Sequence, residues 1–165
     1  MMNAEPSGND VEFRQLEPRP VLYIRATAQI EQLGEAMGDR IQALSSYIRE
    51  RGAQPAGPPF VRYHTFGETE TDFEFGVPVV KPVAGEGRIA TGELPGGPAV
   101  STWHFGPDDK LGEAYARIEG WLKAHGREPD GPAWEVYHWI DLGQGDTPTQ
   151  PEPSTRGIQL VQPIK

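Results

Sequence analysis

An acidic residue set between aromatic residues is the part of this sequence best suited to chemistry. Glu135, Tyr137 and Trp139 alternate along residues 131–140, a segment that opens on Gly-Pro and is rich in aromatic and β-branched residues. Such a segment predicts a β-strand, whose alternate residues share one face. A carboxylate beside ring faces suits an organic cation. Partial burial would also raise the pKa of Glu135 and suit it to act as a general base toward water.

The simpler interpretation is that Glu135 is a solvated residue on an open sheet. Glu74 is a second candidate, because it lies between Phe73 and Phe75 in a predicted strand and could be a second carboxylate near the site. The four histidines show no spacing typical of a metal site, and no Ser-His-Asp motif is recognisable. We therefore expect neither a metal nor a cofactor.

Composition limits the class of protein. The 165 residues suffice for one domain, or for two small halves that share one core. The absence of cysteine excludes disulfides and thiolate chemistry and fits a reducing compartment. The net charge of −9 disfavours direct binding to nucleic acid. We find neither an apolar run of transmembrane length nor a signal peptide, so we expect no membrane association and a cytoplasmic location.

The first half of the chain predicts a strand, a helix and two further strands. Residues 1–14 are polar, residues 1–10 are expected to be disordered, and the first expected strand is 21–26. Apolar residues then follow a helical spacing up to a stop at Gly52. Residues 60–66 and 73–83 are expected to form the two closing strands.

The second half repeats this pattern at an offset of 74 residues, as from Gly52 to Gly126. The same offset relates the two helical stripes, which are Met37, Ile41, Leu44, Tyr47 and Ile48 in the first half and Leu111, Tyr115, Ile118, Trp121 and Leu122 in the second. The opening strand recurs at 100–105 with a connection to its helix five residues shorter, and the closing strand recurs at 158–164 after a loop eleven residues longer. Residues 88–94 could form a hairpin with 100–105 or complete the sheet of the first half.

We therefore predict an α+β fold made of duplicated βαββ units with pseudo-twofold symmetry. Each half is too small to bury a core alone, so the halves should form one antiparallel sheet with both helices on one face. The expected domain is 11–165, with repeats of about 15–86 and 87–165.

Differences between the repeats indicate where function was added. At the offset of 74, Glu135 corresponds to Val61 and Trp139 to Thr65, whereas Tyr137 corresponds to Tyr63. The second repeat thus has a carboxylate and an extra aromatic ring where the first has β-branched residues. This asymmetry favours a functional role for Glu135 over a solvated one.

The sequence resembles the GyrI-like small-molecule-binding domain family, which is also the effector-binding domain of multidrug-sensing bacterial transcription activators. The resemblance covers roughly 11–165 and rests on residues 92–97 (GELPGG), 103–107 (WHFGP), 134–137 (WEVY) and 160–164 (LVQPI). It implies a pocket between the halves for amphipathic, often cationic molecules, with the family's glutamate at Glu135. Unlike the activators, this sequence shows no helix-turn-helix before residue 21.

The resemblance leaves three functions open. The first is stand-alone binding of amphipathic, aromatic or cationic small molecules. The second is hydrolysis of the cyclopropane ring of DNA-alkylating natural products, with Glu135 as general base, and the third is inhibition of DNA gyrase. No surface pattern supports a protein partner. The expected ligand-binding residues are Glu135, Tyr137, Trp139, Tyr63, Trp103 and Glu74.

Overall fold

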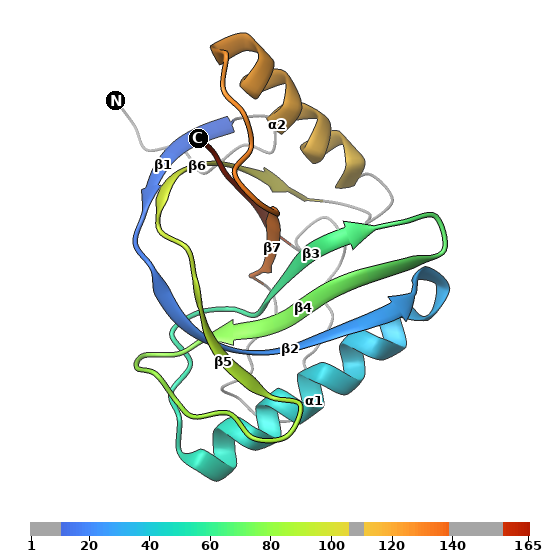
Figure 1. Cartoon of the computed structure of the whole chain (residues 1–165), viewed down its shortest axis with the longest axis vertical. Helices are drawn as coiled ribbons and strands as arrows, with labels where there is room; N and C mark the ends of the chain where they lie inside the picture. The colour runs from blue at the N-terminus through green and yellow to red at the C-terminus, as the bar shows by residue number, and fades with distance from the viewer. Residues whose placement is uncertain (1–10, 106–110, 139–156) are drawn as a thin grey trace.

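A computed structural model describes residues 11–105, 111–138 and 157–165 (Figure 1). The first part of the chain forms β1 (Val11–Leu16), β2 (Arg19–Gln29), a 3-10 turn (Ile30–Gln32), α1 (Leu33–Arg51), β3 (Phe60–Phe66) and β4 (Glu70–Pro78). The second part forms β5 (Ala90–Leu94), β6 (Gly97–His104), α2 (Leu111–His125), β7 (Trp134–Tyr137) and β8 (Ile158–Pro163). The strands form one antiparallel sheet in the order β1-β6-β8-β7-β3-β4-β2-β5. The α+β prediction is confirmed.

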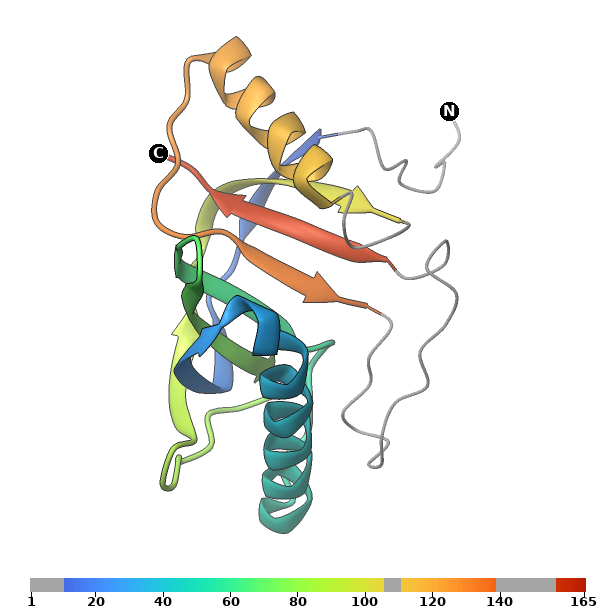
Figure 2. The same cartoon turned by 90° about the vertical axis from the view of Figure 1, so that its right-hand side faces the viewer.

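Both helices cover the same face of the sheet, as predicted. Helix α1 packs on β2 and β4, and α2 packs on β6, β8 and β1. Val61 of β3, in the core beneath α1, pairs across the strands with Glu135 of β7, which accepts a hydrogen bond from α2. Paired residues of neighbouring strands project to one face. Figure 2 shows β7 and β8 side by side, with α2 and α1 on either side of them.

The duplication is confirmed in the backbone hydrogen bonds. Gly52 and Gly126 end the two helices with the same left-handed φ of 63°, a conformation that glycine adopts without the clash of a Cβ. The residue after each glycine donates to a carbonyl one turn back, Ala53 to Ile48 and Arg127 to Leu122. The strand–helix–strand–strand units β2-α1-β3-β4 and β6-α2-β7-β8 are therefore equivalent.

The alignment of the opening strands is corrected by one residue. The carbonyl of Pro20 accepts from the amide of Val79, and the carbonyl of Pro98 accepts from the equivalent amide of Ile164. Pro20 is thus equivalent to Pro98, an offset of 98 − 20 = 78, and the second connection is four residues shorter than the first rather than five. A slip of one residue would exchange the faces of the strand.

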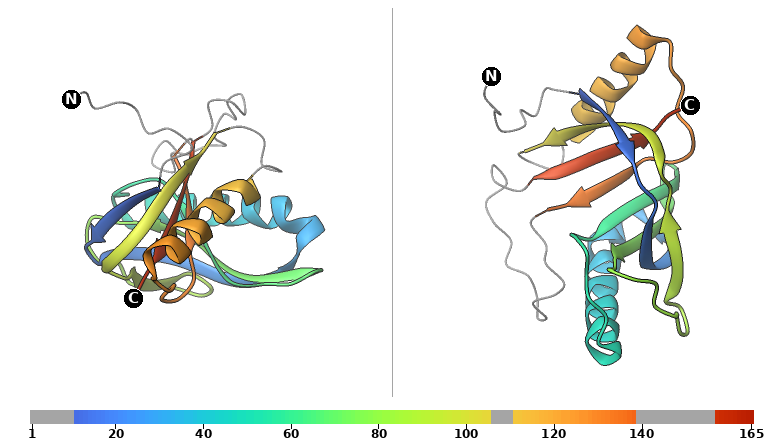
Figure 3. Two further views of the ribbon diagram at one scale, coloured as in Figure 1. Left: turned by 90° about the horizontal axis from the view of Figure 1, so that it is seen from above. Right: turned by 90° about the vertical axis from the view of Figure 1, so that its left-hand side faces the viewer.

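The strands β1 and β5 each join the sheet of the other repeat. The first strand was expected at residues 21–26, but β1 precedes it and pairs with β6 along its whole length. Of the two alternatives for residues 88–94, the structure shows the second, because β5 pairs with β2. Figure 3 (right) shows β1–β2 and β5–β6 as two long bent ribbons beside each other. Their bends touch, since a Cβ on Gly96 would lie 2.6 Å from Cδ of Pro18. The predicted disorder of residues 1–10 falls outside the described residues.

Candidate functional site

Glu135 lies in the centre of the sheet, on the face that carries the helices. Its carboxylate is buried, with 4% of the residue exposed. The hydroxyl of Tyr115 on α2 donates to Oε2 at 2.5 Å, and the hydroxyl of Tyr137 donates to Oε1 at 2.6 Å. Both oxygens of a buried carboxylate are thus hydrogen-bonded, which offsets part of the cost of removing it from water.

The tyrosines come from three elements that converge on Glu135. Tyr137 follows it by two residues on β7 and therefore shares its face. Tyr115 reaches down from α2, and Tyr63 on β3 interacts electrostatically with both other tyrosines. Three of the predicted site residues, Tyr63, Glu135 and Tyr137, therefore lie on one face of the sheet.

The hydroxyls of Tyr115 and Tyr137 remain protonated at neutral pH. Burial, together with the negative charge of Glu135, raises the pKa of Tyr115 well above its usual value. The same two causes, in the same order, raise the pKa of Tyr137. Both side chains therefore act as hydrogen-bond donors to Glu135.

Sequence reasoning missed Tyr115, although the repeat carried the signal. Tyr115 is equivalent to Ile41, just as Glu135 is equivalent to Val61. In the first repeat these two residues belong to the apolar core beneath α1. The second repeat has therefore replaced an apolar helix–sheet contact by a hydrogen-bonded one.

Glu74 and Trp103, two of the predicted ligand-binding residues, lie on the opposite face of the sheet. Glu74 alternates with Phe73 and Phe75, whose side chains form the core beneath α1. Its carboxylate lies 3.8 Å from Nη1 of Arg62 and 3.4 Å from Nε2 of His64. The expected second carboxylate is therefore separated from Glu135 by the sheet.

Trp103 packs against other rings on that opposite face. Its ring centroid lies 4.5 Å from that of His138 and 5.7 Å from that of Phe105. Trp103 pairs with Gln159 on β8, and Gln159 pairs with Val136, the neighbour of Glu135 that projects away from the helices. Trp139, the remaining predicted residue, lies outside the described residues.

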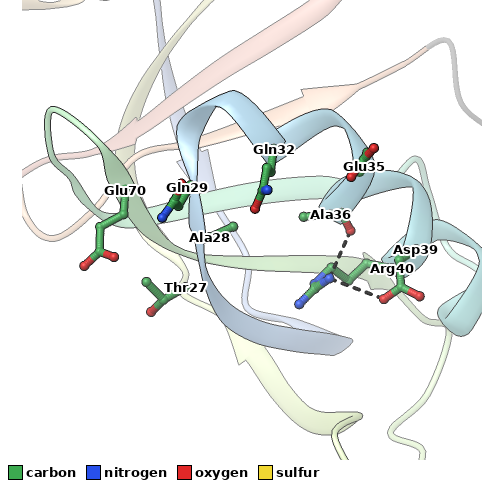
Figure 4. Close-up of a pocket in the computed structure, with 9 residues that line it drawn as sticks. All are labelled: Thr27, Ala28, Gln29, Gln32, Glu35, Ala36, Asp39, Arg40 and Glu70. Atoms are coloured by element: carbon green, nitrogen blue, oxygen red, sulfur yellow. Dashed lines mark hydrogen bonds and ion pairs between the residues drawn. The ribbon is translucent and has the colours of Figure 1, made fainter.

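A polar hollow of about 470 Å³ lies in the first repeat, where β2 ends and α1 begins (Figure 4). Its lining includes Glu35, Asp39, Arg40 and Glu70, and none of the predicted site residues. Figure 4 shows the Arg40 guanidinium bonded to the Ala36 carbonyl and to Asp39. This hollow is separate from the Glu135 site.

Within the described part of the chain, no group of three or more His, Asp or Glu side chains is arranged to hold a metal ion. Within the same residues, no helix is long and apolar enough to cross a membrane.

Solved structures with this fold include a domain of a DNA-bound protein, a ligand-bound protein and a hydrolase. The C-terminal domain of EcmrR has a TM-score of 0.75 at 20% identity, with 94% of this chain and 97% of that chain covered. SAV2435 bound to tetraphenylphosphonium has a TM-score of 0.64 at 10% identity, with 94% of each chain covered. A hydrolase from Listeria innocua has a TM-score of 0.63 at 12% identity, with 98% and 94% covered. At these identities the similarity shows a common fold.

The EcmrR chain in the structure of its complex with DNA has a TM-score of 0.77 at 20% identity, with 94% of this chain covered. This chain spans 57% of the length of that EcmrR chain. No curated protein matches the sequence. The sequence does match the GyrI-like small molecule binding domain over residues 9–141, most of the chain. The protein therefore belongs to the GyrI-like family of small-molecule-binding domains.

Proposed function

We propose that the protein binds amphipathic small molecules with an aromatic or cationic group at Glu135, between the two repeats. The observation that carries this proposal is the buried carboxylate held by Tyr115 and Tyr137. The phenols are neutral, so their hydrogen bonds leave the negative charge of the carboxylate in place. In a weakly polar environment that charge attracts a cation more strongly than it would in water.

The aromatic rings add a second source of affinity. Tyr63, Tyr115 and Tyr137 are only partly buried, whereas the carboxylate is fully buried. A ligand therefore meets the rings on its way to Glu135. Ring faces attract a cation by about 0.5–2 kcal/mol each, depending on desolvation. Charge and stacking together favour lipophilic cations, the class to which the ligand of the SAV2435 structure belongs.

Calorimetry with tetraphenylphosphonium and the neutral triphenylphosphine oxide tests the proposal. Glu135→Gln should weaken binding of the cation at least about tenfold and that of the neutral compound less than about threefold. Glu74→Gln is the matched control, because Glu74 lies on the opposite face of the sheet. Equal losses for both compounds, or an equal effect of Glu74→Gln, would refute a countercharge role for Glu135.

Hydrolysis of a strained ring is the second candidate. It is supported by the hydrogen bonding of Glu135, because each carboxylate oxygen accepts one tyrosine hydroxyl and has a second lone pair. Each carboxylate oxygen has two lone pairs, so a water can bind beside a tyrosine hydroxyl. Glu135 would take a proton as the water oxygen bonds to a cyclopropane carbon. The electrons of the breaking carbon–carbon bond would pass to a conjugated carbonyl, which is then protonated. General-base catalysis typically contributes 10²–10⁴-fold in rate.

Mass spectrometry separates the two candidates. The purified protein is incubated with a cyclopropane-bearing alkylating compound, and a hydrolase would produce the compound plus one water faster than buffer does. Glu135→Gln should reduce that rate by about 10²–10⁴-fold while binding through the rings persists. Binding without a faster gain of water would leave binding as the function. Inhibition of DNA gyrase stays a prediction of the family resemblance.

A further inference from the structure

The connection between β4 and β5 covers one side of α1 and is held there by three side chains of the helix. Figure 1 shows this connection beside α1. The hydroxyl of Tyr47 donates to the carbonyl of Ala84 at 2.5 Å, and Arg51 lies 3.1 Å from Glu86. A third contact, of 2.8 Å, joins Asp39 to Arg88.

Apolar contacts and a tight turn complete this arrangement. Val83 and Ile89 pack against the core beneath α1. Glu86 and Ile89 exchange two backbone hydrogen bonds of 2.9 and 3.0 Å, which close the segment into a turn. Tyr47 is consequently buried, with 5% exposed.

Helix α2 has residues of the same chemical type as the three side chains of α1 that hold residues 83–89. At the offset of 74, Asp39, Tyr47 and Arg51 correspond to Glu113, Trp121 and His125. An acid, an aromatic ring with a polar hydrogen and a base thus recur at the same helical positions. The described residues contain no segment that is placed on α2 as residues 83–89 are placed on α1. Trp121 is only partly buried there and stacks on His125, with ring centroids 3.9 Å apart.

The N-terminal residues of this chain do not have the side chains to replace that segment. Val11 packs against the core beneath α2 as Ile89 does beneath α1, which sets an offset of 78 for the residues before β1. At this offset in the sequence, Gly8 corresponds to Glu86 and Asp10 corresponds to Arg88. An acid in place of Arg88 would oppose Glu113 rather than pair with it.

We propose that Glu113, Trp121 and His125 on α2 form a docking surface for a short turn-forming segment of a partner protein. The segment has the pattern of residues 83–89: an apolar residue, then an acid facing His125 and Lys123, then a base facing Glu113, and a closing apolar residue. Complementary charge sets its direction along the helix, and the apolar residues cover Trp121. This surface is distinct from the Glu135 site.

The probe is a synthetic peptide with the sequence of residues 81–90, added to the ¹⁵N-labelled full chain. We expect a saturable shift of the Trp121 indole signal, with a dissociation constant of about 1 mM or below, since a free peptide loses conformational freedom on docking. Glu113→Arg should weaken binding at least about fivefold. A peptide with Arg88→Glu should restore it on that variant, whereas Asp39→Arg on α1 should leave it unchanged.

The proposal would be refuted if no saturable shift appeared at 5 mM peptide, which is about five times the expected dissociation constant. It would also be refuted if Glu113→Arg left the affinity for the peptide unchanged. Binding that appears only after removal of residues 1–10 would make the N-terminus the occupant of α2. Self-association without peptide that is lost in Trp121→Ala would make a second copy of the chain the occupant.

Discussion

Replacing Tyr115 by Phe should lower the free energy of unfolding by about 1.5–3 kcal/mol at pH 7. The ring and its packing stay, and only the hydroxyl that donates to Oε2 of Glu135 at 2.5 Å is lost. Hydrogen bonds to charged groups contribute about that much, and removing one donor leaves a buried carboxylate oxygen less well solvated. Urea unfolding followed by tryptophan fluorescence measures the change.

A double-mutant cycle isolates the contact between Tyr115 and Glu135. Glu135→Val introduces the residue that the first repeat has at the equivalent position, Val61. In that background Tyr115→Phe should cost little, which gives a coupling free energy of at least about 1.5 kcal/mol. A coupling below about 0.5 kcal/mol would show that the hydroxyl does not stabilise the carboxylate.

Tyr47→Phe provides the matched control on the other helix. Its hydroxyl also donates at 2.5 Å, but to the neutral carbonyl of Ala84. Its loss should cost about 0.5–1.5 kcal/mol and should not couple to Glu135→Val. Coupling of equal size for Tyr47 would indicate a global effect of Glu135→Val on the fold.

Three further predictions concern pH, the helix ends and the repeats. The pKa values of Tyr115 and Tyr137 are raised in the folded state, so the unfolded chain loses these protons at a lower pH than the folded chain does. The free energy of unfolding should therefore fall above about pH 10, by up to about 1.4 kcal/mol per pH unit for each tyrosine. In urea unfolding, Tyr115→Phe should make this fall less steep, and an unchanged slope would contradict the raised pKa of Tyr115. Gly52→Ala and Gly126→Ala should each cost about 1 kcal/mol in thermal unfolding, because both residues have a φ of 63°, and a large difference between them would contradict their equivalence. Fragments divided after residue 86 should not fold separately, because β1 pairs with β6 and β5 with β2; two cooperative, independent melting transitions by circular dichroism would disprove the shared core.

The fold could be predicted from the sequence because it is repeated. A single apolar stripe or a single turn is weak evidence, but Gly52 and Gly126 recur in the same register as the residues packed beneath each helix. We propose on the same grounds that residues 11–165 form one domain with its repeat boundary near residue 86. The crossed pairing of β1 and β5 ties the two repeats together.

The exchange of strands could not be predicted, because it depends on contacts far apart in the chain. Val11–Leu16 has three charged or amide residues among its six, and its alternation is weak. Its partner β6 lies in the other repeat. The opening strands were misaligned by one residue for a similar reason, since Val21 resembles Val100 in type but is equivalent to Ala99 by its hydrogen-bonded neighbours. Register of this kind is set by pairing rather than by residue type.

At the site, the alternation of residues along β7 predicted correctly which side chains share a face. The presence of aromatic neighbours in the sequence did not predict which side chains lie near Glu135. Glu135 and Tyr137 share a face because they are two residues apart on β7. Glu74 was expected beside them because it lies between two phenylalanines, yet the same alternation buries Phe73 and Phe75 under α1 and directs Glu74 to the other face. Because Phe73 and Phe75 are buried beneath α1, their position on either side of Glu74 indicates that Glu74 points away from Glu135.

The comparison of repeats has more power when it is applied to pairs of residues in contact. Glu135 in place of Val61 could be a single tolerated surface change, but Glu135 is buried, and a lone carboxylate there would be costly. A second replacement, Tyr115 in place of Ile41, stabilises this carboxylate because its hydroxyl donates a hydrogen bond to Glu135 from helix α2. Two linked polar replacements at one helix–sheet contact are hard to explain by stability alone, because the equivalent residues of the first repeat, Ile41 and Val61, are apolar and belong to the core beneath α1. The paired replacement is therefore the strongest structural reason to place function at Glu135.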